Sequence, residues 1–157
     1  MKSLIIYDSA YGNTEMVALA IKRALDEQGA ATISLVKSAQ ADMLDDIDLL
    51  IVGSPTQGGQ PTRAMLDYVR DIPNIRVKNL RIASFDTRYA EKEHGFGLKM
   101  LMRIIGYAAP KMADILRLKG ATLIGNPEGF IVTGQEGPLK DDELNRAIAW
   151  ARTLIKR

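Results

Sequence analysis

The sequence has 157 residues, and 21 lysines and arginines against 19 aspartates and glutamates give a formal net charge of +2. Apolar residues at 46% and charged residues at 25% are ordinary for one folded domain and exclude disordered and fibrous chains. The sequence has no cysteine and one histidine, which excludes disulfides, thiol chemistry and metal sites rich in Cys or His. The apolar run at 4–7 is too short for a signal peptide or a membrane span, so we expect a cytoplasmic protein.

Short apolar runs alternate with segments of helical period along the whole chain. Strands are predicted at 3–8, 31–36, 48–53, 80–86 and 122–132, the last of them interrupted at Asn126-Pro127. Helices are predicted at 15–28, 62–70, about 108–119, and from about 141 to the end of the sequence. This alternation predicts one domain over residues 1–157, an α/β fold with a doubly wound, five-stranded parallel sheet and helices on both faces.

The strand order that suits such a chain is 2-1-3-4-5, and its ligands bind beyond the carboxyl ends of the strands. The candidate site is therefore expected in the loops after Asp8, Gly53 and Phe85. Two helices carry apolar residues at core spacing, which are Met16, Ala20, Ile21, Ala24 and Leu25 in the first and Ala147, Trp150, Ala151 and Leu154 in the last. Asp141 and Asp142 are expected at the start of the last helix, as its cap and first-turn acids.

The first loop, Ser9–Thr14, runs from a strand directly into a helix and reads SAYGNT. Ser9, Asn13 and Thr14 carry short hydrogen-bonding side chains, and Gly12 allows a tight turn. Unpaired N–H groups and the positive end of the helix dipole point at the same spot, so the segment predicts a phosphate site built from neutral donors. The alternative is that Asn13 or Thr14 merely caps the helix.

The same segment resembles the flavin mononucleotide (FMN) phosphate loop of the flavodoxin family, which reads Ser/Thr-x-Thr-Gly-x-Thr. Here Tyr11 stands in place of the commoner Thr, as it does in flavodoxin-like quinone reductases, and Ala10 fills the free position. The segment GSPTQGG at 53–59 resembles the second flavin loop, and TLIGNPEGFIV at 122–132 resembles the interrupted fifth strand of short-chain flavodoxins. The resemblance covers essentially the whole chain and implies FMN as the cofactor.

For the second loop, the resemblance implies that Pro55 and Thr56 line the ribityl chain and ring, and that the Gly58 carbonyl faces flavin N5. Gly59 stands where the family usually has an acidic residue, and the alternative is that Gly58 and Gly59 form only a flexible turn. Gln57 stands where flavodoxins often stack an aromatic residue or Met on the flavin. We therefore expect weaker FMN binding, or a ring open to a substrate.

For the third loop, FDTRY, the resemblance implies that Asp86, Thr87, Arg88 and Tyr89 lie at the end of the fourth strand, within reach of the flavin. Tyr89 is the candidate for the missing stacking residue. Arg88 beside the N1–O2 edge would favour reduced flavin and raise its reduction potential. The alternative is an arginine paired with Asp86 or Glu91.

The segment 94–107 is unusually apolar for a loop. It either begins the fourth helix or forms an amphipathic turn near the flavin, in which 96–107 present Met and Ile to a partner, a dimer mate or a hydrophobic substrate. The positive net charge differs from the strongly acidic flavodoxins, which indicates an acidic partner or contact with an anionic membrane surface. Nucleic acid is not expected, because no recognition motif is present.

The resemblance implies an FMN protein that carries electrons between redox partners that the sequence does not identify. One alternative is an FMN-dependent oxidoreductase acting on a quinone or a porphyrin-like substrate, because flavodoxin-like protoporphyrinogen oxidases also carry an insertion near 94–107. A second alternative is a flavin-free interaction domain of the same fold. A phosphoacceptor receiver is not expected, because Gly53 stands where its aspartate would be.

Overall fold

The computed structural model describes residues 1–89 and 106–156. Its strands form one parallel sheet of order β2-β1-β3-β4-β5, in which β6 also pairs with β4, so the predicted order is confirmed. The strands are β1 (Lys2–Tyr7), β2 (Ala30–Leu35), β3 (Leu49–Pro55), β4 (Arg81–Tyr89), β5 (Thr122–Leu123) and β6 (Glu128–Val132). Thus β5 and β6 are the two halves of the predicted fifth strand, separated at Asn126-Pro127.

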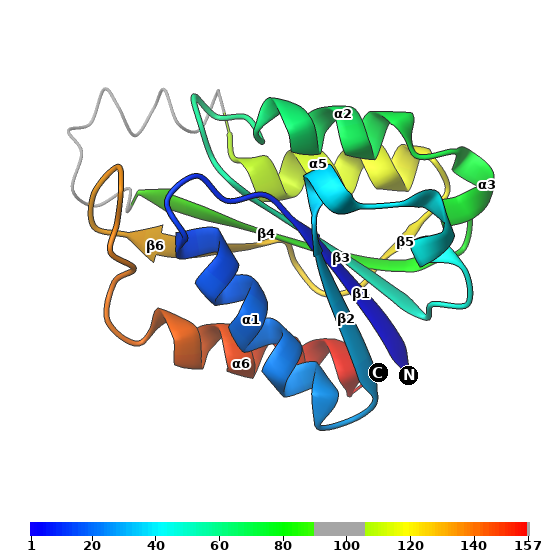
Figure 1. Ribbon diagram of the computed structural model, residues 1–157, viewed down its shortest axis with the longest axis horizontal. Helices are drawn as coiled ribbons and strands as arrows, with labels where there is room; N and C mark the ends of the chain where they lie inside the picture. The colour runs from blue at the N-terminus through cyan, green and yellow to red at the C-terminus, as the bar shows by residue number, and fades with distance from the viewer. Residues whose placement is uncertain (90–105, 157) are drawn as a thin grey trace.

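Helices cover both faces of the sheet, as Figure 1 shows. One face packs against α1 (Asn13–Asp26) and α6 (Glu143–Ile155), and the other against α2 (Arg63–Asp71) and α5 (Ala108–Leu118). The short helices α3 (Asn74–Val77), η1 (Val36–Ser38) and η2 (Ala41–Leu44) lie in connections between these elements. Among the helices of the described ranges, none is both long enough and apolar enough to span a membrane.

The core lies on both sides of the sheet, because β1 and β3 are apolar without alternation and bury both of their faces. Phe85, Phe130 and Trp150 pack edge to face, with ring centroids 6.1 to 6.3 Å apart. The predicted core face of α6 is confirmed by the burial of Ala147, Trp150, Ala151 and Leu154. In α1 the prediction was wrong for Met16, which is 42% exposed, because the buried stripe passes through Val17 and Ala18 instead.

The structure corrects two further predictions, which concern the end of the fourth strand and the cap of the last helix. The fourth strand does not end at Asp86, because β4 continues to Tyr89 while its last residues pair with β6. Asp142 precedes α6 with a φ of 71° and makes no side-chain bond to the helix N–H groups; its Oδ1 accepts instead from the Asn145 side chain. Of the expected apolar segment 96–107, only residues 106 and 107 lie within the described part of the chain.

Candidate functional site

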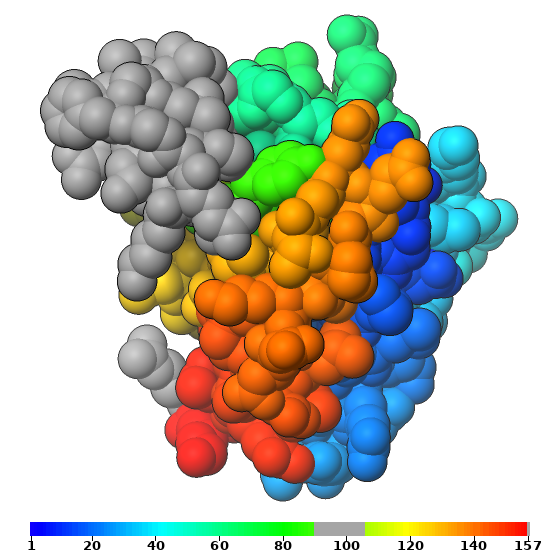
Figure 2. Space-filling model, turned by 90° about the vertical axis from the view of Figure 1, so that its left-hand side faces the viewer, coloured from blue at the N-terminus to red at the C-terminus, as the bar shows by residue number. Residues whose placement is uncertain are grey.

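The three segments singled out in the sequence meet at the carboxyl edge of the sheet, which Figure 2 views. Parallel β1, β3 and β4 run in register toward this edge, where Tyr7, Gly53 and Phe85 lie side by side. The predicted third strand ended at Gly53, but β3 continues to Pro55, so the second loop begins after that residue. The residues predicted for the third loop do not form a loop, since Asp86, Thr87, Arg88 and Tyr89 are the last residues of β4. They still lie at the same edge, beside β3 and β6.

The first loop presents backbone donors at the start of α1. Gly12 adopts a left-handed φ of 91° there, and Ser9 Oγ accepts the Gly12 N–H at 3.1 Å. Four further N–H groups have no acceptor within the described ranges, those of Ala10, Tyr11, Asn13 and Thr14. Neither Asn13 nor Thr14 caps the helix with its side chain, because both are its first residues. The loop therefore offers neutral donors to an anion.

Thr14 joins the first loop to β4. Its side chain is buried, and its Oγ1 lies 2.9 Å from Thr87 Oγ1. The two hydroxyls share one hydrogen bond, so one of their two protons is left for another acceptor. Two residues predicted for separate loops are thus brought into direct contact.

A fourth segment, the connection from β6 to α6, also reaches the first loop, and the sequence reasoning did not find it. Asn13 Nδ2 donates to the Glu136 carbonyl at 3.1 Å, and Figure 2 shows this segment in orange beside the blue N-terminal residues. Gly137 has a φ of 101°, and a Cβ there would lie 2.6 Å from Asn13 Oδ1. The only local signal was the Gly137-Pro138 pair, which is typical of a turn without indicating what the turn contacts.

The second loop forms a tight, hydrogen-bonded turn. Gln57 and Gln60 exchange two backbone hydrogen bonds of 2.8 and 3.0 Å. Gly58 and Gly59 between them have φ values of 55° and 77°, as a type I′ turn requires. Gln57 and Gly58 are exposed, while Gly59 is buried. The contacts of this turn with a flavin ring remain a prediction.

Asp8 and Thr62, which were not predicted as site residues, tie the first loop to the segment that follows the second. Thr62 Oγ1 donates to Asp8 Oδ2 at 2.6 Å and accepts the Met65 N–H, which caps α2. The other carboxylate oxygen of Asp8 accepts the Ser9 N–H at 3.0 Å. The signal available in the sequence was an acidic residue at the very end of a buried strand.

Asp86 is fully buried beneath α5 and forms a bidentate ion pair with Arg88, at 2.6 and 2.8 Å. Burial raises the pKa of the Asp86 carboxyl, while hydrogen bonds from Arg88, the Ala109 N–H and Thr56 oppose that rise. Of the arrangements considered for Arg88, the structure has the pair with Asp86; Glu91 lies outside the described residues. Tyr89 ends β4 and is 38% exposed.

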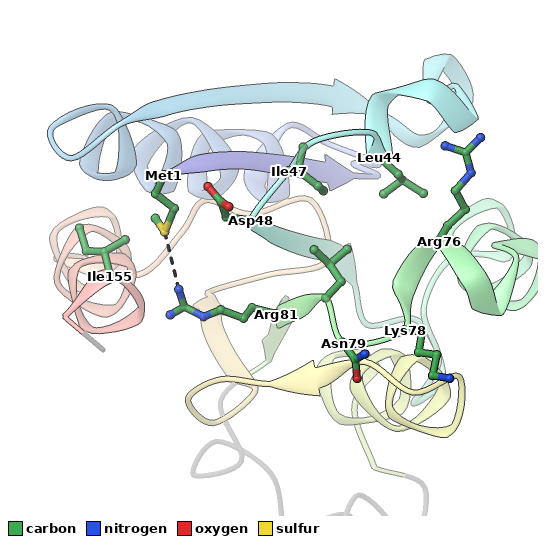
Figure 3. Close-up of a pocket in the computed structure, with 10 residues that line it drawn as sticks. Met1, Leu44, Ile47, Asp48, Arg76, Lys78, Asn79, Arg81 and Ile155 are labelled. Carbon is green, nitrogen blue, oxygen red and sulfur yellow. Dashed lines mark hydrogen bonds between the residues drawn. The ribbon is translucent and has the colours of Figure 1, made fainter.

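The opposite edge of the sheet holds a cavity of about 710 Å³, drawn in Figure 3. Two of the charged residues that line this cavity make hydrogen bonds to the backbone of neighbouring elements. Asp48 accepts the Lys2 N–H at 2.7 Å, and Arg81 donates to the Leu154 carbonyl at 3.0 Å at the end of α6. Within the described ranges, no cluster of His, Cys, Asp and Glu is suited to hold a metal ion.

Comparisons with known proteins agree with this architecture. The family model described as flavodoxin matches residues 5–150. A flavodoxin from the domain Archaea superposes with a TM-score of 0.78 at 18% identity, covering 99% of this chain and 97% of that one. Flavodoxin 2 from Bacillus cereus gives 0.77 at 22% identity, covering 99% of both chains. Rubredoxin oxygen:oxidoreductase from Desulfovibrio gigas gives 0.75 at 18% identity, covering 99% of this chain and 35% of that one.

Proposed function

The chain belongs to the flavodoxin family, whose cofactor is FMN, and on that premise we propose that it carries electrons between redox partners with FMN bound at the carboxyl edge of its sheet. When bound, FMN supplies the redox chemistry, and the protein positions and shelters it. The proposed phosphate site is Ser9–Thr14. The proposed ring site is Pro55–Gly59 together with Asp86–Tyr89 at the end of β4. A cytoplasmic location stays a prediction from the sequence.

The observation that carries the proposal is the set of unpaired N–H groups at the start of α1. Four backbone donors, those of Ala10, Tyr11, Asn13 and Thr14, have no acceptor within the described part of the chain, and one proton of the Thr14–Thr87 pair is also left over. Hydrogen bonds to a charged group contribute roughly 1.5–3 kcal/mol each. Neutral donors at a helix N-terminus therefore fit the phosphate of FMN without a lysine or arginine in the loop.

The exposed Gln57 is the observation that favours the alternative function, an FMN-dependent oxidoreductase. A turn that carries neither an aromatic residue nor Met at this position leaves more of a flavin ring open to a substrate. Stepwise reduction of the FMN-loaded protein under nitrogen separates the two functions. We expect electrons to enter in two resolved one-electron steps; entry of both electrons in a single step would favour the oxidoreductase.

A substitution of Thr14 tests the phosphate site. We expect Thr14→Val to weaken FMN binding by about 1.5–3 kcal/mol while leaving riboflavin binding nearly unchanged, because riboflavin has no phosphate. Quenching of flavin fluorescence measures both dissociation constants. Thr87→Val is the control, since it removes the same bond between the two threonines and leaves Thr14 in place. An equal loss for FMN and riboflavin in Thr14→Val would contradict a phosphate site in this loop.

A further inference from the structure

Asp86 is a buried carboxylate that accepts hydrogen bonds from two elements. Arg88 donates from β4 through Nε and Nη2, and the Ala109 N–H donates from α5 at 2.8 Å. Asp86 is 0% exposed, so its carboxylate lies away from bulk water. Buried charges of this kind are costly unless they are paired and hydrogen-bonded.

Thr56 is linked to this carboxylate through the start of α5. Its Oγ1 accepts the Ala108 N–H at 3.0 Å, and the next N–H of that helix, from Ala109, donates to Asp86 at 2.8 Å. Its own N–H donates to the Thr87 carbonyl at 2.9 Å. The residue that leads into the Gln57–Gln60 turn is therefore held by β4 and by the first residues of α5, with Asp86 as their common contact.

Arg88 places a positive charge farther along β4 than Asp86, toward the carboxyl edge of the sheet. Its guanidinium lies over the Tyr107 ring, with Cζ 3.7 Å from the centroid. It also passes Gly129 on β6, where a Cβ would collide with the guanidinium. These contacts hold the Arg88 guanidinium in place. The net charge at this end of β4 therefore depends on the Asp86 carboxylate that pairs with it.

We propose that Asp86 is a positioning residue with two effects on the flavin site: it holds Thr56 and the second loop in place, and it cancels the charge of Arg88. The inference rests on the proposed FMN function. Without the carboxylate, the uncompensated guanidinium would favour reduced FMN, which carries more negative charge than oxidised FMN. Asp86 therefore keeps the reduction potential of bound FMN lower than Arg88 alone would set it.

Two variants that lack the Asp86 carboxylate measure the effect of the Arg88 charge, because one keeps the cation and the other removes it. Asp86→Asn keeps the shape and one acceptor oxygen, and Asp86→Asn/Arg88→Met removes the cation as well. We expect Asp86→Asn to bind reduced FMN at least tenfold more tightly, relative to oxidised FMN, than the wild type does. That ratio corresponds to a potential about 30 mV higher for a two-electron couple. The double variant should return to within about threefold of the wild-type ratio.

The measurements are the dissociation constants of oxidised and chemically reduced FMN, the midpoint potential, and urea unfolding of the FMN-free proteins. The proposal that Asp86 cancels the charge of Arg88 would be overturned if the midpoint potential shifted equally in both variants, or in neither. Failure of the wild-type protein to bind FMN would instead overturn the proposed function.

A second pair of variants avoids the buried charges and tests the positioning effect. Thr56→Val should weaken FMN binding without moving the potential, and Thr56→Ser, which keeps the hydroxyl, should restore the binding. Unchanged binding in Thr56→Val would overturn the positioning effect.

Discussion

Tyr68 on α2 buries its hydroxyl oxygen without an acceptor among the residues that the structure describes, and burial raises the pKa of this phenol to about 12. An unpaired buried polar group costs about 1–3 kcal/mol. We therefore expect Tyr68→Phe to increase the free energy of unfolding by about 1 kcal/mol in urea titrations at neutral pH. The control is Tyr7→Phe, because the Tyr7 hydroxyl donates to Glu15 Oε1 at 2.9 Å and its loss should destabilise the fold. A matching loss of stability in both variants would show that the Tyr68 hydroxyl has a partner.

At the scale of single residues, the sequence predicts groups whose role follows from local chemistry. The donors of Ser9–Thr14 and the two glycines of the second loop are of this kind, because a strand-to-helix turn and a type I′ turn need those residue types. The Asp86–Arg88 pair was one of the alternatives for Arg88, but their common strand face was not predicted, because the fourth strand was expected to end at Asp86. The contacts of Asp86 with Thr56 and Ala109, and of Gly137 with Asn13, join distant segments and leave no local pattern.

The start of α6 is anchored to β6 by a network of charged groups. Glu143 Oε2 accepts the Ile131 N–H at 2.6 Å, and Arg146 donates to both oxygens of Glu143 and to Glu128. Burial alone would raise the pKa of Glu143, but these hydrogen bonds and the charges of Arg146 and Lys140 lower it overall. Its stabilising contribution is therefore complete above the ordinary glutamate pKa of about 4.3 and is lost as the pH falls through the lowered value.

We expect Glu143→Gln to reduce the free energy of unfolding by about 1–3 kcal/mol at pH 7, because it weakens bonds to a charged group. The difference from the wild type should shrink as the pH falls below about 4, where the wild-type carboxylate also becomes protonated. Urea unfolding at a series of pH values measures this. Asp141→Asn, at an exposed position two residues earlier, should leave stability nearly unchanged. A difference that persists undiminished at pH 2 would contradict an electrostatic origin.

At the scale of elements, the sequence predicts long segments better than their ends. Three elements were predicted correctly from their patterns, β1 and β3 from unbroken apolar runs and α6 from its helical period. These patterns arise because both faces of the two strands and one face of the helix are buried. The end of β4 was misplaced, because Asp86 looks like the start of a loop until Arg88 pairs with it and β6 extends the sheet. The helix α3 has four residues, too few to show a period.

At the scale of the whole molecule, one sheet links the two halves of the core. Ile5 and Ile51 face α1 and α6, while Leu4, Leu50 and Val52 on the same strands face α2 and α5. Neither helical layer can lose its packing without exposing the shared strands. We therefore expect a single cooperative unfolding transition, in line with the one domain predicted over 1–157.

The same linkage predicts how FMN affects the whole chain. A ligand that binds only the folded state at 100 times its dissociation constant adds about 2.7 kcal/mol to the free energy of unfolding. Because the proposed site draws on β1, β3 and β4, this gain should appear equally in the fluorescence of Trp150, on the α6 side, and in circular dichroism, which reports all helices. Riboflavin at the same multiple of its own dissociation constant is the matched control and should add the same free energy. If FMN shifts the fluorescence transition but leaves part of the circular dichroism transition where it was, the α2 and α5 layer unfolds on its own and the single-domain prediction is wrong.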